Sequence, residues 1–342
     1  MNIFTAVQHS KDLNQFYSSL WSYNFYPALK QLGHQIIESQ VDLLPASRFM
    51  QIAKDFTPEE KELRSQITQK IINEVREAHQ KKPIDLFLSY FYNSHFDPAG
   101  FEEIHKLGIP TVNFYCNSIY QFELVSTIAQ AVNFSWHAEK DARSQYLEVG
   151  ANPVWVQMGA DPDVYYPVPN VTRQRKACFL GQRYADRADY LAQLLMANIP
   201  VNIYGKGWGA DSQGISPSPK ETAPQKEASY LGRKIVQPSS VASYTQVIRE
   251  NLQRHGWIGG IQQTINQFRY RRKNRSHSLV LASAAQGYAN SIPETFSRHE
   301  VVLNFSNVWS DGRPGSKLIP HVRLRDFEAP LCRSCYLTGY TE

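Results

Sequence analysis

The feature that most constrains the fold is a repeated alternation between short apolar runs and longer segments with helical periodicity. The runs are rich in β-branched and aromatic residues, and polar loops follow them, as is typical of buried parallel strands. One helix start is explicit, because residues 57–60 are Thr-Pro-Glu-Glu, a capping box with Pro at the first helical position. Strands alternating with helices predict an α/β protein built on doubly wound parallel sheets.

The alternation occurs twice, on either side of a short linker. Residues 158–167 read MGADPDVYYP, and their Gly and Pro content indicates a break between domains. We therefore predict two Rossmann-like domains that face a cleft, over residues 1–160 and 161–342, each near the usual size of about 150 residues. Strands are expected at 2–7, 36–37, 84–91, 111–116, 132–136, 154–157, 177–181, 200–204, 301–306 and 334–339.

Residues 210–290 interrupt the rhythm of the second domain. Ser, Pro, Gln and Lys dominate 211–228, which predicts a surface insertion, and the segment from about 241 to 275 has helical character. Its end, residues 268–275, carries four Arg and one Lys next to Phe and Tyr. This basic run could contact an anionic membrane or a nucleic acid, or it could be a solvated helix end, which is the commoner use of such charge.

The bulk properties exclude several classes of protein. The formal net charge of +5 over 342 residues suits an anionic ligand such as a nucleotide phosphate, but it is too small to indicate nucleic acid by itself. The N-terminus, MNIFTAV, runs into the first strand without a signal peptide, and no window approaches about 18 consecutive apolar residues. We therefore expect a cytoplasmic protein that touches a membrane, if at all, only from outside.

Common cofactor and metal motifs are absent from the sequence. No GxGxxG follows the first strand, and no GxxxxGK[ST], GxSxG, HExxH or DxDxDG occurs, so we expect neither a cofactor nor a motif-bound metal. Cys332 and Cys335 form a CxxC, which is most simply a coincidence of spacing, with a redox or metal role as the alternative. Charge at the strand ends of the second domain remains, where open α/β sheets bind ligands.

Several segments of the second half occur in an order that resembles a known enzyme family. They are MGADPDVYYP, FLGQRYADRADYLAQL, YGKGW, VVLNFS, RLRDFEAP and CYLTGYTE. Together, over residues 158–342, they resemble the C-terminal half of the CgeB-like (spore-maturation-type) glycosyltransferases, which are related to family-4 transferases of the GT-B fold. The resemblance implies a metal-independent, hexosyltransferase-type enzyme. It would use a nucleotide-diphosphate sugar as co-substrate and a glycan, protein or lipid as acceptor.

The resemblance also implies roles for charged residues of the second domain. Glu328 matches the carboxylate that holds the donor ribose hydroxyls, which suits a vicinal diol because a carboxylate accepts two hydrogen bonds. Arg183 and Arg187 match positions that meet the diphosphate. Arg323 or Arg325 would neutralise the charge that builds on the departing diphosphate, so that the reaction needs no metal.

Glycines and an aromatic residue complete the donor site that the resemblance implies. Gly181 lets the backbone approach a phosphate closely. The nucleotide base and a nearby phosphate are expected beside Gly205, Lys206 and Trp208.

The sequence also departs from the family pattern. Relatives carry a second Glu eight positions before the first, where this chain has Pro320, and a small glycine after the following helix, where it has Arg333. No glycine-rich loop occurs between residues 7 and 19. Family members continue past the point that corresponds to residue 342, so the resemblance implies a second domain that is truncated at its C-terminus.

The first domain is expected to take the acceptor. An inverting transferase needs a general base within reach of the acceptor hydroxyl, and the candidates are His95 and Asp97 after the third strand and His9 after the first. A retaining mechanism would need no such base, and both remain open. The alternative is a non-catalytic nucleotide- or carbohydrate-binding module on the same scaffold, with nucleic-acid binding through 268–275 the least favoured.

Overall fold

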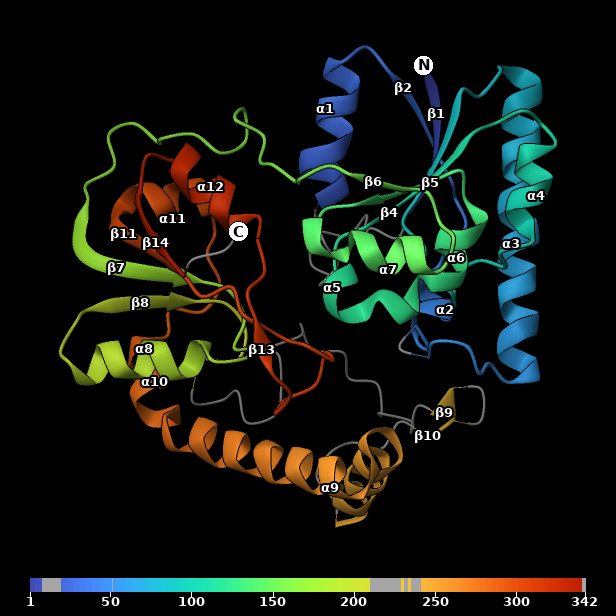
Figure 1. Cartoon of the computed structure of the whole chain (residues 1–342). Coiled ribbons are helices and arrows are strands. Elements are labelled where there is room, and N and C mark those ends of the chain that lie inside the picture. The colour runs from blue at the N-terminus through green and yellow to red at the C-terminus, as the bar shows by residue number, and fades with distance from the viewer. Residues whose placement is uncertain (8–19, 51, 210–228, 231–232, 235–240, 340–342) are drawn as a thin grey trace. The chain divides into compact units, whose positions relative to one another are not determined.

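The chain folds into two compact units, Met1–Asp161 (unit 1) and Pro162–Glu342 (unit 2). The structure is a computed structural model that describes residues 1–7, 20–50, 52–209, 229–230, 233–234 and 241–339. Each unit holds a parallel sheet with helices packed on it (Figure 1). The predicted α/β class with doubly wound parallel sheets is therefore confirmed.

Unit 1 contains a six-stranded parallel sheet in the order β2-β1-β3-β4-β5-β6. Its strands are β1 (Asn2–Ala6), β2 (Gln35–Glu38), β3 (Leu86–Ser89), β4 (Thr111–Tyr115), β5 (Phe134–His137) and β6 (Pro153–Trp155). The chain moves outward from β1 to β2 and then returns to the other side of β1 with β3. This reversal makes the carboxyl ends of β1 and β3 the topological switch point, where open sheets bind ligands.

Helices cover both faces of the first sheet, and α1 and α3 lie on opposite sides of β1 and β2 (Figure 1). The predicted capping box starts α3, because Thr57 Oγ1 accepts from the Glu60 amide at 3.3 Å and the Glu60 carboxylate accepts from the Thr57 amide at 2.9 Å. The helical segments are η1 (Trp21–Phe25, a π-helical turn), α1 (Tyr26–Gln31), α2 (Leu44–Ser47), α3 (Pro58–Lys81), α4 (Gly100–His105), α5 (Ser118–Gln121), η2 (Phe122–Leu124), α6 (Ser126–Ala131), η3 (Lys140–Ala142) and α7 (Arg143–Glu148).

Unit 2 contains a four-stranded parallel sheet in the order β14-β11-β7-β8. Its strands are β7 (Gln174–Leu180), β8 (Val201–Tyr204), β11 (His299–Asn304) and β14 (Cys335–Thr338). The helices next to these strands include α8 (Arg187–Met196), α11 (Ile292–Arg298) and α12 (Arg325–Leu331). The switch point here lies between β7 and β11. Two short antiparallel pairs join β9 (Ser229–Tyr230) to β10 (Arg233–Lys234) and β12 (Val308–Trp309) to β13 (Leu318–Ile319).

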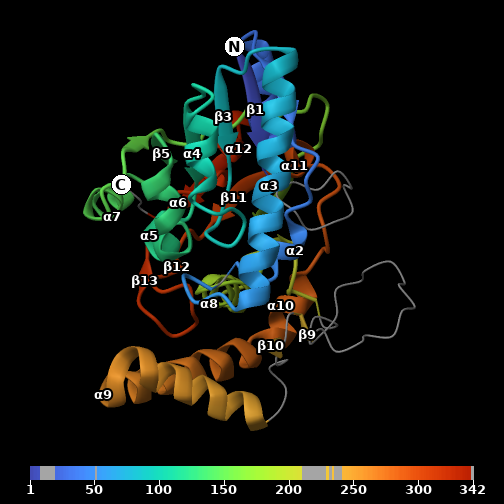
Figure 2. The same ribbon diagram turned by 90° about the vertical axis from the view of Figure 1, so that its right-hand side faces the viewer.

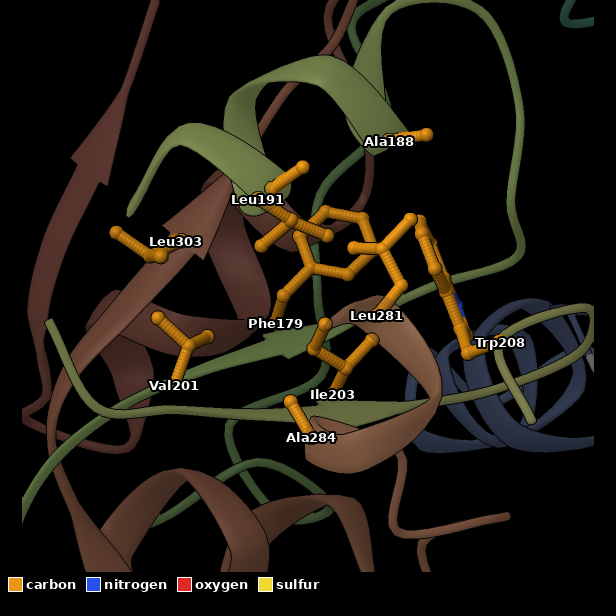
Figure 3. Packing of buried hydrophobic residues seen from close by; sticks show 10 residues of the cluster. Phe179, Ala188, Leu191, Val201, Ile203, Trp208, Leu281, Ala284 and Leu303 are labelled. Atoms are coloured by element: carbon orange, nitrogen blue, oxygen red, sulfur yellow. The ribbon is translucent and has the colours of Figure 1, made fainter. Parts of the chain in front are cut away.

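The predicted insertion over 210–290 is too long at its C-terminal end. Helix α10 (Ser278–Ala284) lies within that range, yet Leu281 and Ala284 are buried in the core of unit 2 beside Phe179 (Figure 3). Before it, α9 (Val241–Ser276) confirms the predicted helix and bends at Gly256. Among the described residues, no helix is long and apolar enough to cross a membrane.

Candidate functional site

The loops after β7 and β8 touch through two glycines. Gly205 has a φ of +119°, and a Cβ there would lie 2.4 Å from the Gly181 carbonyl oxygen, so only glycine fits without displacement. The Trp208 indole Nε1 donates to that same oxygen at 2.7 Å. Gly181 in turn donates its amide to the Tyr204 carbonyl at 3.0 Å. The predicted glycines therefore form a tight backbone junction at the carboxyl edge of the sheet.

Trp208 belongs to the core and differs from the prediction in this respect. Its side chain is only 1% exposed and packs edge-on against the Phe179 ring, with centroids 5.7 Å apart (Figure 3). A base-stacking role needs an exposed ring face, which this conformation does not offer. We therefore assign Trp208 to positioning the Gly181–Gly205 junction.

Arg187 bridges the two strand ends at the switch point of unit 2. Its Nε donates to the Phe305 carbonyl, after β11, and its Nη1 donates to the Gln182 carbonyl, after β7, both at 3.0 Å. The guanidinium also lies 5.6 Å from the centre of the Phe179 ring. Burial lowers the pKa of Arg187 to about 10, and the nearby charge of Arg323 adds to that effect.

Arg323 and Arg325 join Arg187 in a cluster of three guanidinium groups. Arg325 and Arg187 both donate to backbone carbonyls at the end of β7 and just after it, and the charges of Arg323 and Arg325 lower the pKa of Arg187. The Arg323 Nε is buried and has no hydrogen-bond partner among the described residues, and Arg325 Nε donates to the Leu180 carbonyl at 3.4 Å. Neither Arg187 nor Arg323 forms an ion pair with a carboxylate in the described parts of the chain. Such a cluster attracts an anion.

Glu328 is buried in the first turn of α12, where it forms an ion pair with Arg325. The carboxylate is 2% exposed. Burial also lowers the pKa of Arg325, which stays charged at neutral pH because Arg starts from a very high value. The ribose role of Glu328 therefore stays a prediction, and in this conformation the carboxylate serves Arg325.

Asp326 is a residue of this site that the sequence analysis overlooked. Its carboxylate accepts hydrogen bonds from the Arg323 amide at 2.6 Å, the Tyr336 hydroxyl at 2.5 Å and the Asn304 side-chain amide at 3.1 Å. These bonds fasten the start of α12 to β11 and β14. The available signal was an acidic residue directly after two Arg at a helix start, where the helix dipole favours it.

Arg183 and Lys206 lie beside the junction, but Arg183 is already occupied by protein atoms. Its Nε donates to Asn274 Oδ1 at 2.8 Å, and its guanidinium also contacts the Asn274 carbonyl and lies 3.4 Å from Ser278 Oγ. Burial lowers its pKa. The predicted diphosphate contact is thus replaced, in this conformation, by a tie between the loop after β7 and the end of α9. Lys206 is exposed.

The acceptor-side candidates of unit 1 fall into three different situations. His95 is buried, with Nδ1 accepting from the Tyr92 amide at 3.3 Å, so its neutral ring carries the proton on Nε2 and donates to Ser47 Oγ at 2.8 Å. Burial lowers the pKa of His95 to about 3, which makes it a poor base at neutral pH. Asp97 is 41% exposed and lies 3.7 Å from Arg64. His9 lies outside the described residues.

A neutral aromatic cluster, which the sequence analysis did not single out, lies at the ends of β3 and β4. The Tyr115 ring lies 5.8 Å from Tyr90 and 5.3 Å from Tyr92, and the Tyr90 hydroxyl is 3.4 Å from the sulfur of Cys116. Burial raises the pKa of all three tyrosines, so they are neutral. The available signal was the Tyr residues at the ends of two predicted strands, Tyr90 and Tyr92 around the end of 84–91 and Tyr115 near the end of 111–116.

Metal ligands do not gather in the described parts of the chain, where no group of three or more His, Cys, Asp or Glu side chains lies close enough to share an ion.

Comparisons with known proteins identify the fold. No family model matches the chain, and no curated protein matches it. The structure resembles AviGT4, a glycosyltransferase involved in avilamycin A biosynthesis, with a TM-score of 0.50 and 10% identity over 98% of this chain and 78% of that one.

Two further solved structures are less similar. A glycosyltransferase from Rickettsia africae has a TM-score of 0.48 and 10% identity, over 98% of this chain and 78% of that one. Acinetobacter baumannii MurG has a TM-score of 0.39 and 7% identity, over 98% of this chain and 85% of that one. The assignment of the fold rests on the similarity to AviGT4 and not on these two structures. With its parallel sheets of six and four strands, the chain has the α/β fold of the GT-B glycosyltransferases.

Proposed function

We propose that the chain is a glycosyltransferase that moves a sugar from a nucleotide-diphosphate donor to an acceptor. The observation that carries the proposal is the cluster of Arg187, Arg323 and Arg325 at the switch point of unit 2. Two of these guanidinium groups have no carboxylate partner among the described residues, and the Gly181–Gly205 junction lies beside them. Doubly wound sheets bind nucleotides at this position.

The cluster suits the chemistry of a departing diphosphate. Negative charge builds on the diphosphate as its bond to the sugar breaks, and fixed guanidinium groups stabilise that charge without having to reorganise. The buried Nε of Arg323 has no partner among the described residues and is an unmet donor that a phosphate oxygen would satisfy. This arrangement supplies positive charge from side chains alone, so the proposed reaction needs no metal.

Glu328 would take the donor ribose after an exchange of partners. Arg325 holds the carboxylate in the described conformation. A bound diphosphate competes for the Arg325 guanidinium and thereby releases the Glu328 oxygens for the vicinal hydroxyls. We therefore propose that the Arg325–Glu328 pair opens when the donor binds.

The finer points of the proposal rest on the family resemblance. They are a CgeB-like subgroup, a hexosyl donor, a cytoplasmic location and an acceptor bound by unit 1. Asp97 is the described candidate for a general base, because His95 has both ring nitrogens occupied. Because neither ring nitrogen of His95 is available to act as a base, the second candidate function is a nucleotide- or carbohydrate-binding module without catalysis.

Calorimetric titration of UDP, GDP and ADP into the full chain tests the donor site. We expect binding of at least one of them, and Arg323→Gln should raise its Kd by about 10-fold or more, because a charge-assisted hydrogen bond is lost. Arg175→Gln is the matched control, since that side chain is 95% exposed, and it should leave the Kd unchanged.

The outcomes separate the two functions. Absence of binding by all three nucleotides, or equal Kd values for the wild type and Arg323→Gln, contradicts the donor site. Binding without hydrolysis or transfer of any UDP-, GDP- or ADP-sugar favours the binding module. Release of the nucleoside diphosphate that depends on Arg323 supports the transferase.

A further inference from the structure

An exposed apolar stripe runs along the second arm of α9. Helix α9 bends at Gly256, where φ is 69° and ψ is −177°, and Figures 1 and 2 show the two helical arms that result. Ile258, Ile261, Ile265 and Phe268 follow one another at spacings of three and four residues, which places them on one face. All four are exposed, as is Trp257 beside the bend, at 88% for Ile258 and 76% for Trp257.

Other side chains of the same arm attach it to the first arm of α9 and to the rest of unit 2, mostly through polar contacts. Asn251 donates to Thr264 Oγ1 across the bend at 3.0 Å, and Asn266 donates to the Gly315 carbonyl at 3.4 Å. Near the end of the arm, Lys273 forms an ion pair with Asp189 of α8 at 2.8 Å. Apart from Tyr270, whose ring packs edge-on against Trp309 with centroids 5.1 Å apart, these contacts use polar side chains. The apolar stripe stays in water, which is the reverse of an ordinary surface helix.

The charge of this region is entirely of one sign. Residues 251–276 contain no Asp or Glu. Arg269, Arg272 and Arg275 are exposed, form no ion pair among the described residues, and follow the stripe along the arm. A shallow groove lined by Ile248, Leu252 and Trp257 extends the apolar surface onto the first arm.

We propose that α9 docks on a bilayer surface that carries anionic lipid headgroups, with the stripe buried at the headgroup level and the three Arg among the phosphates. A helix with Trp, Ile and Phe on one side and clustered Arg beside them has the composition of an interfacial helix. Each Arg near an anionic surface adds about 1 kcal/mol, or about 5-fold, to partitioning. This surface is separate from the proposed donor site and does not depend on it.

Two other occupants fit less well. A nucleic acid would use the Arg side chains but would leave Ile258, Ile261 and Ile265 in water. A second copy of this chain would cover the stripe, but it would present another surface without acidic residues to the unpaired Arg. The lipid bilayer alone uses both the apolar stripe and the charge.

Co-sedimentation with vesicles tests the proposal. The full chain should sediment with an equal mixture of phosphatidylcholine and phosphatidylglycerol, but not with phosphatidylcholine alone. The double variant Ile261→Glu with Ile265→Glu should lower partitioning by at least about 10-fold, since apolar burial is lost. Replacing Arg269, Arg272 and Arg275 by Gln should lower it by about 100-fold. Leu147→Glu on α7, also an exposed apolar position, should change nothing.

Circular dichroism and a cooperative thermal unfolding transition confirm that each variant is folded. Failure of the wild type to sediment with anionic vesicles overturns the proposal, as does equal sedimentation of the Ile and Leu147 variants. Light scattering that shows a dimer abolished by the two Ile changes, without vesicle binding, would assign the stripe to a second copy. Preferential binding of duplex RNA or DNA over vesicles would assign the basic residues to nucleic acid.

Discussion

The carboxyl ends of the two sheets share a topology but differ in their chemistry. In unit 2 the described loops after β7 and β11 gather three guanidinium groups around a glycine junction. In unit 1 the described loops after β3 and β4 gather neutral tyrosines and an uncharged His95. The fold thus supplies two similar edges, and the side chains decide which edge attracts an anion.

The largest expected effect comes from the junction that distinguishes unit 2. Gly205→Ala places a Cβ 2.4 Å from the Gly181 oxygen at a φ of +119°, so it combines a clash with backbone strain. We expect a loss of at least about 3 kcal/mol, measured by hydrogen exchange of the β7 and β8 amides. Gly108→Ala in unit 1 is the control, because its φ of +75° is strained but its Cβ meets open space. That change should cost about 1 kcal/mol in β3 and β4. Equal losses would show that the junction is not tight.

The second largest effect is expected when one acidic residue at the carboxyl end of each sheet is replaced by Ala. Asp326→Ala removes the acceptor for three hydrogen bonds and should destabilise unit 2 by about 2 kcal/mol or more. Asp97→Ala, which loses an exposed contact with Arg64, should cost about 0.5 kcal/mol. Urea denaturation of both variants measures the two losses. If Asp326→Ala lowers the free energy of unfolding by no more than Asp97→Ala does, the hydrogen bonds of Asp326 do not stabilise the site.

The smallest effect concerns the neutral state of His95. Its pKa is about 3 in the folded protein and about 6.5 when unfolded, so only the unfolded chain binds the proton between these values. Stability should therefore fall as the pH drops from about 6.5, by up to about 1.4 kcal/mol per pH unit from this group. His95→Gln should show a shallower slope in urea denaturation at pH 7, 6 and 5. An unchanged slope would mean that folding does not lower the pKa of His95, and would contradict its neutral, buried state.

The sequence was sufficient for the class of fold because its signals are local. The Thr57 capping box and the period of the apolar residues depend on neighbours a few positions apart, and the structure confirms both. The Arg cluster was also accessible in part, since Arg187, Arg323 and Arg325 stand at helix starts after strands.

The structure departs from what the sequence suggests where burial depends on distant partners. His95 is neutral because Ser47 and the surrounding core enclose it, and no local pattern announces that contact. Trp208 stands among glycines in a polar stretch, yet its indole enters the core beside Phe179. Helix α10 was assigned to an insertion because residues 210–290 interrupt the alternation of strands and helices, and nothing local shows that Leu281 and Ala284 face the core. Long-range packing decided each of these cases.

Hydrogen exchange of the full chain, with and without a saturating nucleoside diphosphate, tests the central claim most directly. The account predicts new protection in residues 181–187, 205–207 and 305–307, which follow β7, β8 and β11. In Arg323→Gln the same protection should require a nucleotide concentration higher by about 10-fold or more. Protection confined to residues 90–97 and 116–118 of unit 1, with none after β7 and β11, would contradict it.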